Sequence, residues 1–287
     1  MTQLNIKDSL TYETIISRFT AWAEVSGKVQ AAFVIGSRAR LDRPADEYSD
    51  LDLVLVVDDP NCFLSADDWL NAIGCFNISF DEYTIGGARE RRVLFDGALD
   101  VDFLLFTKAQ YIECTRSPEF LSLFARGYRA LLDNGGFSSL ITDGIGTLPS
   151  RSMMSPQEFA NLVNNFWYHT VWAAKKLKRG ELWVAKHCVD GYMKGLLLRM
   201  IECHACALHG DNYETWHGGR FLESWADPVI VAALPATFGQ YDLADLERAL
   251  HEMTELFGRL GREAADVLGY PYPIEAERAA TGCVPFP

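Results

Sequence analysis

The chain has 287 residues, 49% of them hydrophobic, and a formal net charge of −13. This length suits one large domain or two ordinary ones, and the apolar share supports a sizeable core, which excludes a largely disordered protein. The acidic balance argues against a nucleic-acid partner, because nucleic-acid surfaces need a basic stripe. It suits a cationic small-molecule substrate.

Several features indicate a cytoplasmic protein. The seven cysteines lie at irregular spacings, which shows no disulfide framework and favours a reducing compartment. The N-terminal stretch "MTQLNIKDSL" lacks the charged-then-apolar order of a signal peptide. No apolar run is long enough to span a bilayer without charges, so we expect no membrane partner. The oligomeric state, monomer or homodimer, stays open.

The first half of the chain mixes helical and strand patterns. Apolar residues at helical spacing predict a helix over residues 8–25. Apolar runs predict strands over residues 28–35, 52–57, 91–97 and 99–106. The last two are expected to pair around a turn at Asp96–Gly97. Residues 118–131 favour a helix, and the loop-forming residues 133–139 follow it.

The character of the sequence changes near residue 150. Ser155 is a candidate N-cap, with Pro156 at the first helical position and Glu158 in the first turn. Helical patterns then dominate, over residues 157–179, 181–209, 218–226 and 242–267. We therefore expect an α+β domain over residues 1–150 and a helical domain over residues 151–287.

Two acidic residues open one of the predicted strands. Side chains alternate between the faces of a strand, so Asp50 and Asp52 should point the same way, roughly 6–7 Å apart along the backbone. Residues 53–57 are apolar on both faces, which indicates a buried strand with the acids at its entry. Paired carboxylates of this kind favour Mg²⁺, which leaves coordination positions open for substrate phosphates.

A third acid would complete a site for two metal ions. The predicted strand over residues 99–106 offers Asp100 and Asp102 on one face, and spacing alone does not choose between them. Upstream, Gly36 and Ser37 follow a strand, and Arg38 comes next. Glycine permits close backbone approach, while a hydroxyl and neighbouring N–H groups can hold phosphate oxygens. The combination of these features favours a functional site over solvated turn residues.

This combination resembles the nucleotidyltransferase superfamily with the polymerase-β-like core. Its signature is a Gly-Ser turn, then two acids one residue apart, then a third strand carboxylate. Here these positions are Gly36-Ser37, Asp50-x-Asp52 and Asp102. Within the superfamily the chain is similar to the aminoglycoside 6-adenylyltransferases, which modify streptomycin. The similar stretches include "GSRARLDRPADEYSDLDL", "RRVLFDGALDVDFLLF" and "HGGRFLESWAD".

The resemblance implies both a fold and a reaction. The fold would be a mixed sheet flanked by helices, followed by a helical substrate-binding domain. The reaction would move AMP from Mg-ATP to a hydroxyl of an aminoglycoside and release pyrophosphate. Asp50 and Asp52 would hold the nucleotide-bound Mg²⁺, and Asp102 would help to hold a second one. Ser37, with the backbone of residues 36–38, would grip the β- and γ-phosphates.

Further roles fall on residues outside this signature. The resemblance implies that Lys194 contacts the triphosphate, although an i,i+4 pair with Asp190 on a solvated helix is an equally weighted alternative. Candidates for a general base are Asp102 first, then Asp190 and Glu82. A polycationic acceptor calls for acids and aromatic rings, and the expected acceptor-binding residues are Glu82, Trp167, Tyr168 and Asp190.

Alternative functions stay open on the sequence. The acceptor could instead be a lincosamide or another small hydroxylated molecule. Leu51 and Arg220 depart from the tyrosine and lysine that the family commonly has, which leaves the identity of the acceptor open. The chain could also be a non-catalytic nucleotide-binding module, although the complete set of acids argues against it. Cys203, His204 and Cys206 invite a zinc site, but the pair-and-pair spacing is absent and packing is favoured.

Overall fold

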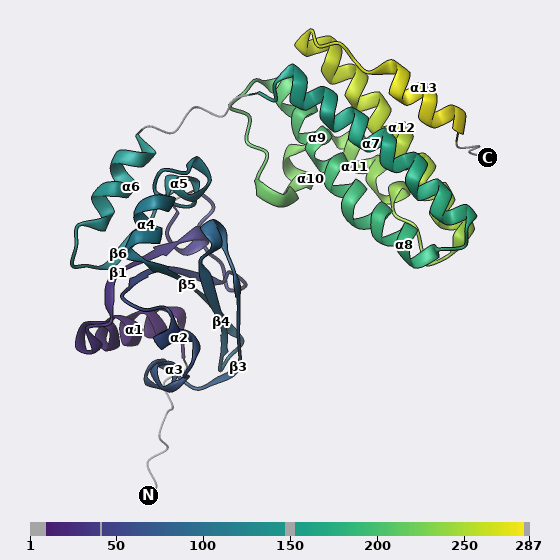
Figure 1. Cartoon of the computed structure of the whole chain (residues 1–287). Helices are drawn as coiled ribbons and strands as arrows, with labels where there is room; N and C mark the ends of the chain where they lie inside the picture. The colour runs from purple at the N-terminus through teal and green to yellow at the C-terminus, as the bar shows by residue number, and fades with distance from the viewer. Residues whose placement is uncertain (1–9, 41, 147–152, 284–287) are drawn as a thin grey trace, which may run out of the picture. The chain divides into compact units, whose positions relative to one another are not determined.

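The computed structural model describes residues 10–40, 42–146 and 153–283, and Figure 1 shows its elements. The chain divides into two compact units, Met1–Pro149 and Ser150–Pro287. The boundary expected at residue 150 lies outside the described residues. Within those residues, no helix is both long and apolar enough to cross a membrane.

The N-terminal unit is built on a six-stranded mixed sheet with the strand order β3-β4-β5-β2-β1-β6. Its strands are β1 (Val29–Ile35), β2 (Leu51–Val57), β3 (Phe76–Tyr83), β4 (Arg89–Phe95), β5 (Leu99–Thr107) and β6 (Arg129–Asp133). The central strands β2 and β5 run parallel, and the other neighbours run antiparallel. The expected strand pair around Asp96–Gly97 is confirmed as the β4–β5 hairpin.

Helices cover both faces of this sheet (Figure 1). They are α1 (Tyr12–Ser26), α2 (Asn61–Leu64), α3 (Asp68–Ile73), α4 (Lys108–Cys114), α5 (Pro118–Ala125) and α6 (Phe137–Ile145). Leu53 and Leu55 pack with α1 and α3 on one face, while Val54 and Val56 pack with α4 and α5 on the other. The strand β2 is apolar because it is buried on both sides, and Asp52 is its one half-buried position.

The sequence patterns failed at some places in this unit. The helix expected over residues 118–131 ends at Ala125, because Gly127 has a φ of +127° and its α-carbon lies against the Ala39 carbonyl, where a Cβ would come within 2.8 Å of the oxygen. The chain then forms β6, and α6 begins inside the expected loop. The edge strand β3 was not predicted, because most of its side chains are exposed and its apolar pattern is weak.

The C-terminal unit is helical. Its elements are α7 (Pro156–Lys178), α8 (Leu182–His187), a π-helix (Cys188–Met193), α9 (Lys194–His209), α10 (Leu222–Trp225), α11 (Pro228–Ala233), α12 (Leu243–Leu268) and α13 (Ile274–Cys283), with 3₁₀ turns at His217–Gly219 and Leu234–Thr237. The core joins α7, α9 and α12, and the rings of Phe166 and Phe257 stack with centroids 3.6 Å apart. Ser155 caps α7 as expected. The predicted α+β class with a following helical region is confirmed.

Candidate active site

Strand pairing brings three aspartates together. Asp52 on β2 lies opposite Asp102 on β5 in the parallel ladder. Asp50 directly precedes β2, and each of the three half-buried carboxylates offers an oxygen within 4.8 Å of the others. Across residues 10–40, 42–146 and 153–283, no other group of three or more acids, histidines or cysteines gathers in this way. The strand register thus supplies a reason to choose Asp102 over Asp100.

The Gly-Ser turn lies directly against this cluster. Ile35 at the end of β1 pairs with Asp52, so the next residue, Gly36, approaches the Asp52 side chain. A Cβ on Gly36 would lie 2.3 Å from Asp52 Oδ2, and Gly36 has a φ of +68°, so both space and backbone conformation require glycine here. The Ser37 hydroxyl is buried and has no hydrogen-bond partner among the described residues. A buried hydroxyl of this kind is available to donate to a ligand.

The Arg38 side chain is engaged by the protein. Its Nε donates to the Asp50 carbonyl at 2.9 Å, and its Nη2 donates to the carbonyls of Ser49 and Asp46. The guanidinium also lies over the Tyr12 ring, 3.5 Å from the centroid. These contacts engage the guanidinium, and the phosphate contact expected of Arg38 involves its backbone and stays a prediction.

Asp102 belongs to a charged network on β3, β4 and β5. Arg92 Nη2 lies 3.5 Å from Asp102 Oδ2, and Arg92 Nε lies 2.7 Å from Glu90 Oε1 and 2.8 Å from Glu82 Oε1. Burial raises the pKa of Asp102 to about 7; Arg92 opposes this rise, and Glu90 and Asp50 add to it. Glu82 is thus linked to Asp102 through Arg92.

Glu90 and Arg92 are site residues that the sequence patterns did not identify. Glu90 is 5% exposed, which is rare for a carboxylate and here is compensated by Arg92. The available signal was the run of charges in "RERR" at the start of a strand. A buried charge on a strand indicates a partner of opposite charge, which for Glu90 lies two residues further along the same strand.

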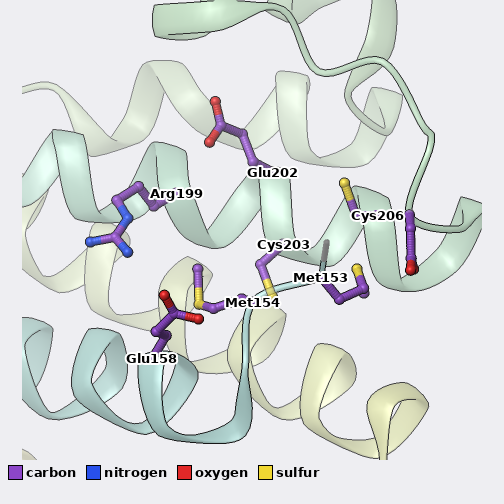
Figure 2. Close-up of a pocket in the computed structure, with 8 residues that line it drawn as sticks. Met153, Met154, Glu158, Arg199, Glu202, Cys203 and Cys206 are labelled. Carbon is purple, nitrogen blue, oxygen red and sulfur yellow. The ribbon is translucent and has the colours of Figure 1, made fainter. Parts of the chain in front are cut away.

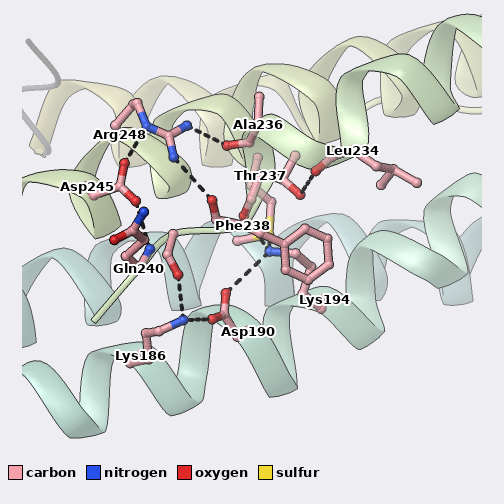
Figure 3. A network of polar contacts seen from close by, with 12 residues as sticks. Lys186, Asp190, Lys194, Leu234, Ala236, Thr237, Phe238, Gln240, Asp245 and Arg248 are labelled. Atoms are coloured by element: carbon pink, nitrogen blue, oxygen red, sulfur yellow. Dashed lines mark hydrogen bonds and ion pairs between the residues drawn. The ribbon is translucent and has the colours of Figure 1, made fainter. Parts of the chain in front are cut away.

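Lys194 and Asp190 lie in the helical unit, in the network of Figure 3. Lys194 Nζ donates to the Thr237 carbonyl at 2.6 Å and lies 3.6 Å from Asp190 Oδ1. Asp190 also pairs with Lys186, which donates to the Gly239 carbonyl at 2.7 Å. Burial lowers the pKa of Lys194 to about 8. The i,i+4 pair is present, but Lys194 is mostly buried and lines a pocket of about 590 Å³ rather than a solvated face.

The two expected aromatic contacts differ in position. Trp167 is 2% exposed, and its indole N–H donates to the Tyr272 hydroxyl at 3.1 Å, so it is a core residue, which corrects its expected place in the acceptor site. Tyr168 is 67% exposed on α7. Its ring neighbours His169, whose ring contacts Tyr192 of the π-helix. An aromatic surface of this kind can contact a ligand.

The cysteines of α9 are buried within the helical unit. Figure 2 shows Cys203 and Cys206 beside a pocket of about 230 Å³ with Met153 and Met154. The intervening His204 points elsewhere, with its Nε2 2.9 Å from Glu263 Oε2. Burial raises the pKa of the Cys203 thiol to about 11, which disfavours the thiolate that a metal ligand requires.

The chemistry of the aspartate cluster fits divalent metal ions. Three carboxylates from two strands supply the hard oxygen ligands that Mg²⁺ prefers. Beside them, the Gly36 turn places the unpaired Ser37 hydroxyl where an oxyanion could accept its hydrogen bond. This arrangement can bind a metal-complexed phosphate.

Comparisons with known proteins agree with this geometry. The family model described as streptomycin adenylyltransferase matches residues 10–282. Two relatives are each named aminoglycoside 6-adenylyltransferase. The one from Campylobacter jejuni is 24% identical and covers 90% of this chain and 89% of its own. The one from Bacillus subtilis is 22% identical and covers 86% and 87%.

A solved structure is also similar to the chain. The crystal structure of an aminoglycoside 6-adenyltransferase from Bacillus subtilis covers 96% of this chain and 99% of its own, at 17% identity and a TM-score of 0.45. The weight of the assignment rests on the family model, which spans nearly all of the described residues. The chain belongs to the streptomycin adenylyltransferase family.

Proposed function

We propose that this protein is an adenylyltransferase that moves AMP from Mg-ATP to a hydroxyl of an aminoglycoside such as streptomycin, with release of pyrophosphate. One observation carries the proposal: oxygens of Asp50, Asp52 and Asp102 lie within 4.8 Å of one another beside the Gly36-Ser37 turn. Membership of the streptomycin adenylyltransferase family supports the reaction, and the names of the two relatives support an aminoglycoside acceptor.

The nucleotide would be held by the N-terminal unit. Two divalent cations, when bound, would neutralise phosphate charge and align the reacting oxygens. Asp50 and Asp52 would hold the one that carries the nucleotide, and Asp102 would help to hold the other. The Ser37 hydroxyl would donate to a β- or γ-phosphate oxygen, together with backbone N–H groups of residues 36–38. Lys194 is a further proposed triphosphate contact, and one of the three N–H donors on its Nζ binds the Thr237 carbonyl.

Proton transfer would involve Asp102. The acceptor hydroxyl must lose its proton as it attacks the α-phosphate, and a carboxylate with a pKa near the working pH is suited to accept it. Burial raises the pKa of Asp102 to about 7 in the metal-free protein, and a bound cation would lower it and favour the carboxylate that can accept the proton. Glu82, which Arg92 links to Asp102, is a proposed contact of the acceptor.

The acceptor side combines acids with an exposed ring. Tyr168 and Asp190 remain proposed acceptor contacts, since Tyr168 is largely exposed and Asp190 is partly so. The net charge of −13 favours a polycation over a neutral acceptor. A role in antibiotic resistance would follow from this activity.

Mass spectrometry of candidate acceptors tests the proposal. Purified protein would be incubated with ATP, Mg²⁺ and streptomycin, other aminoglycosides or a lincosamide. The expected product is streptomycin carrying one added adenylyl group, with pyrophosphate released in equal amount. The Asp52→Asn variant should fold normally and form almost no product. Normal turnover by this variant would disprove the metal-ligand assignment, and modification of the lincosamide alone would disprove the acceptor class.

A further inference from the structure

Asp50 differs from the other two aspartates in how its backbone is held. Asp52 and Asp102 lie opposite each other inside a parallel ladder. The pairs of β2 with β5 begin at Leu51, one residue after Asp50. A metal ligand needs a fixed backbone, because metal affinity falls steeply with ligand disorder. A contact outside the β2–β5 ladder must therefore hold the backbone of Asp50 in place.

Arg38 meets this need through two donors. Its Nε donates to the carbonyl of Asp50 at 2.9 Å, and its Nη2 donates to the carbonyl of Ser49. The same Nη2 also reaches the Asp46 carbonyl at 3.4 Å. A planar guanidinium can hold two neighbouring carbonyls in a fixed geometry, which a lysine ammonium cannot do. Arg38 thus fixes the peptide that carries Asp50 against the turn that carries Ser37.

Tyr12 of α1 contacts the Arg38 guanidinium and holds it in place. The guanidinium carbon lies 3.5 Å from the centroid of the Tyr12 ring, which is a cation–π contact. The Tyr12 hydroxyl donates to Asp100 Oδ1 at 2.8 Å, and Asp100 lies on β5 two residues before Asp102. Tyr12 is 8% exposed, and burial raises the pKa of its hydroxyl to about 12, so this donor keeps its proton.

These contacts form one continuous chain, which we call the brace: Asp100, Tyr12 and Arg38. It begins on β5, the strand of Asp102, and ends on the backbone of Asp50, so it links β5 to the residue directly before β2. We propose that Arg38, held by Tyr12 and Asp100, is a positioning residue that fixes Asp50 for metal binding, and is not a side-chain ligand of phosphate. This inference rests on the proposed function, because it requires Asp50 to be a metal ligand.

The brace also gives Asp100 a role. Asp100 and Asp102 are equivalent by spacing on β5, yet Asp102 joins the aspartate cluster while Asp100 accepts from Tyr12. The carboxylate that stays outside the cluster anchors the ring on which Arg38 lies.

Mn²⁺ binding to the full chain without nucleotide tests the brace, measured by calorimetry or electron paramagnetic resonance. Arg38→Met should weaken Mn²⁺ binding by about tenfold, as is typical when a partner of a metal ligand is lost. Arg38→Lys should not restore it, because the charge returns without the two-donor geometry. Tyr12→Phe should weaken binding less, and should add nothing when combined with Arg38→Met, because both act through one contact chain.

Matched variants separate loss of the brace from a general loss of structure. Tyr128→Phe removes a hydroxyl 3.2 Å from Thr142 Oγ1 in the same unit and should leave Mn²⁺ binding unchanged. If Arg38→Met does not fold, Tyr12→Phe still tests the chain, since it removes one oxygen atom. Unchanged Mn²⁺ binding in Arg38→Met with a raised KM for ATP would overturn the inference and make Arg38 a phosphate ligand. Absence of Mn²⁺ binding in the unaltered protein, with or without ATP, would instead refute the proposed metal centre itself.

Discussion

The Gly36→Ala variant tests the close contact between the Gly-Ser turn and the aspartates. An added Cβ would lie 2.3 Å from Asp52 Oδ2, where ordinary contacts begin at 3.4 Å. The carboxylate or the turn must therefore move by about 1 Å, and a misplacement of about 1 Å at a reacting centre costs roughly 10²-fold in rate. The φ of +68° adds a backbone cost of about 1–2 kcal/mol for any residue with a Cβ.

Gly27→Ala is the matched control for this variant. Gly27 has a φ of +64°, and its Cβ would meet nothing within 4 Å. Backbone strain should cost both variants about 1–2 kcal/mol of unfolding free energy in urea, and any larger loss in Gly36→Ala reports its contact with Asp52. Pyrophosphate release with ATP and streptomycin should fall roughly 10²-fold in Gly36→Ala alone. Near-normal turnover in Gly36→Ala, or an equal loss in Gly27→Ala, would refute the idea that the turn positions Asp52.

Three further predictions concern pH, the aromatic residues and Lys194. The folded pKa of Asp102 is raised to about 7. The contribution of Asp102 to the stability of the metal-free protein should therefore be complete below about pH 4 and should be lost as the pH rises through 7. Urea titrations should show that the unfolding free energy depends less on pH in Asp102→Asn, and an identical pH dependence would contradict the raised pKa. Trp167→Phe should lower the unfolding free energy by about 1–3 kcal/mol with the acceptor KM unchanged, whereas Tyr168→Ala should change stability by less than about 0.5 kcal/mol and raise the acceptor KM. The opposite pattern would place Trp167 in the acceptor site. Lys194→Met should raise the KM for ATP, because Lys194 is a proposed contact of the triphosphate. A lower unfolding free energy with an unchanged KM would show that Lys194 only stabilises the helical unit through Thr237 and Asp190.

The sequence predicted correctly the helices and strands whose own apolar pattern is strong. The long helices α7 and α12 have strong apolar periodicity and good N-caps, and β2 is a buried apolar run. The helix expected to reach residue 131 failed because its end depends on Gly127 meeting Ala39, a contact distant in sequence. Tertiary contacts of this kind override local propensity.

The sequence predicted the residues of the candidate site only in part, for the same reason. Spacing predicted that Asp50 and Asp52 act together, but the choice between Asp100 and Asp102 depends on the pairing of β2 with β5, which spacing does not contain. Trp167 and Tyr168 are consecutive on α7, yet Trp167 is buried and Tyr168 is 67% exposed, and the aromatic run in the sequence did not show which of the two faces a ligand. The resemblance assigned only the backbone of Arg38 to phosphate, and the bonds of its side chain to the carbonyls of Ser49 and Asp50 became visible only in the structure.

The three-aspartate metal centre can be tested by locating Mn²⁺ through its anomalous scattering, in crystals of the protein grown with Mn²⁺ and a non-hydrolysable ATP analogue. We expect Mn²⁺ at about 2.1 Å from oxygens of Asp50, Asp52 and Asp102, with analogue phosphate oxygens completing its coordination and a phosphate oxygen within hydrogen-bond distance of Ser37 Oγ. Mn²⁺ bound elsewhere, or an analogue seated away from the Gly36-Ser37 turn, would contradict this assignment.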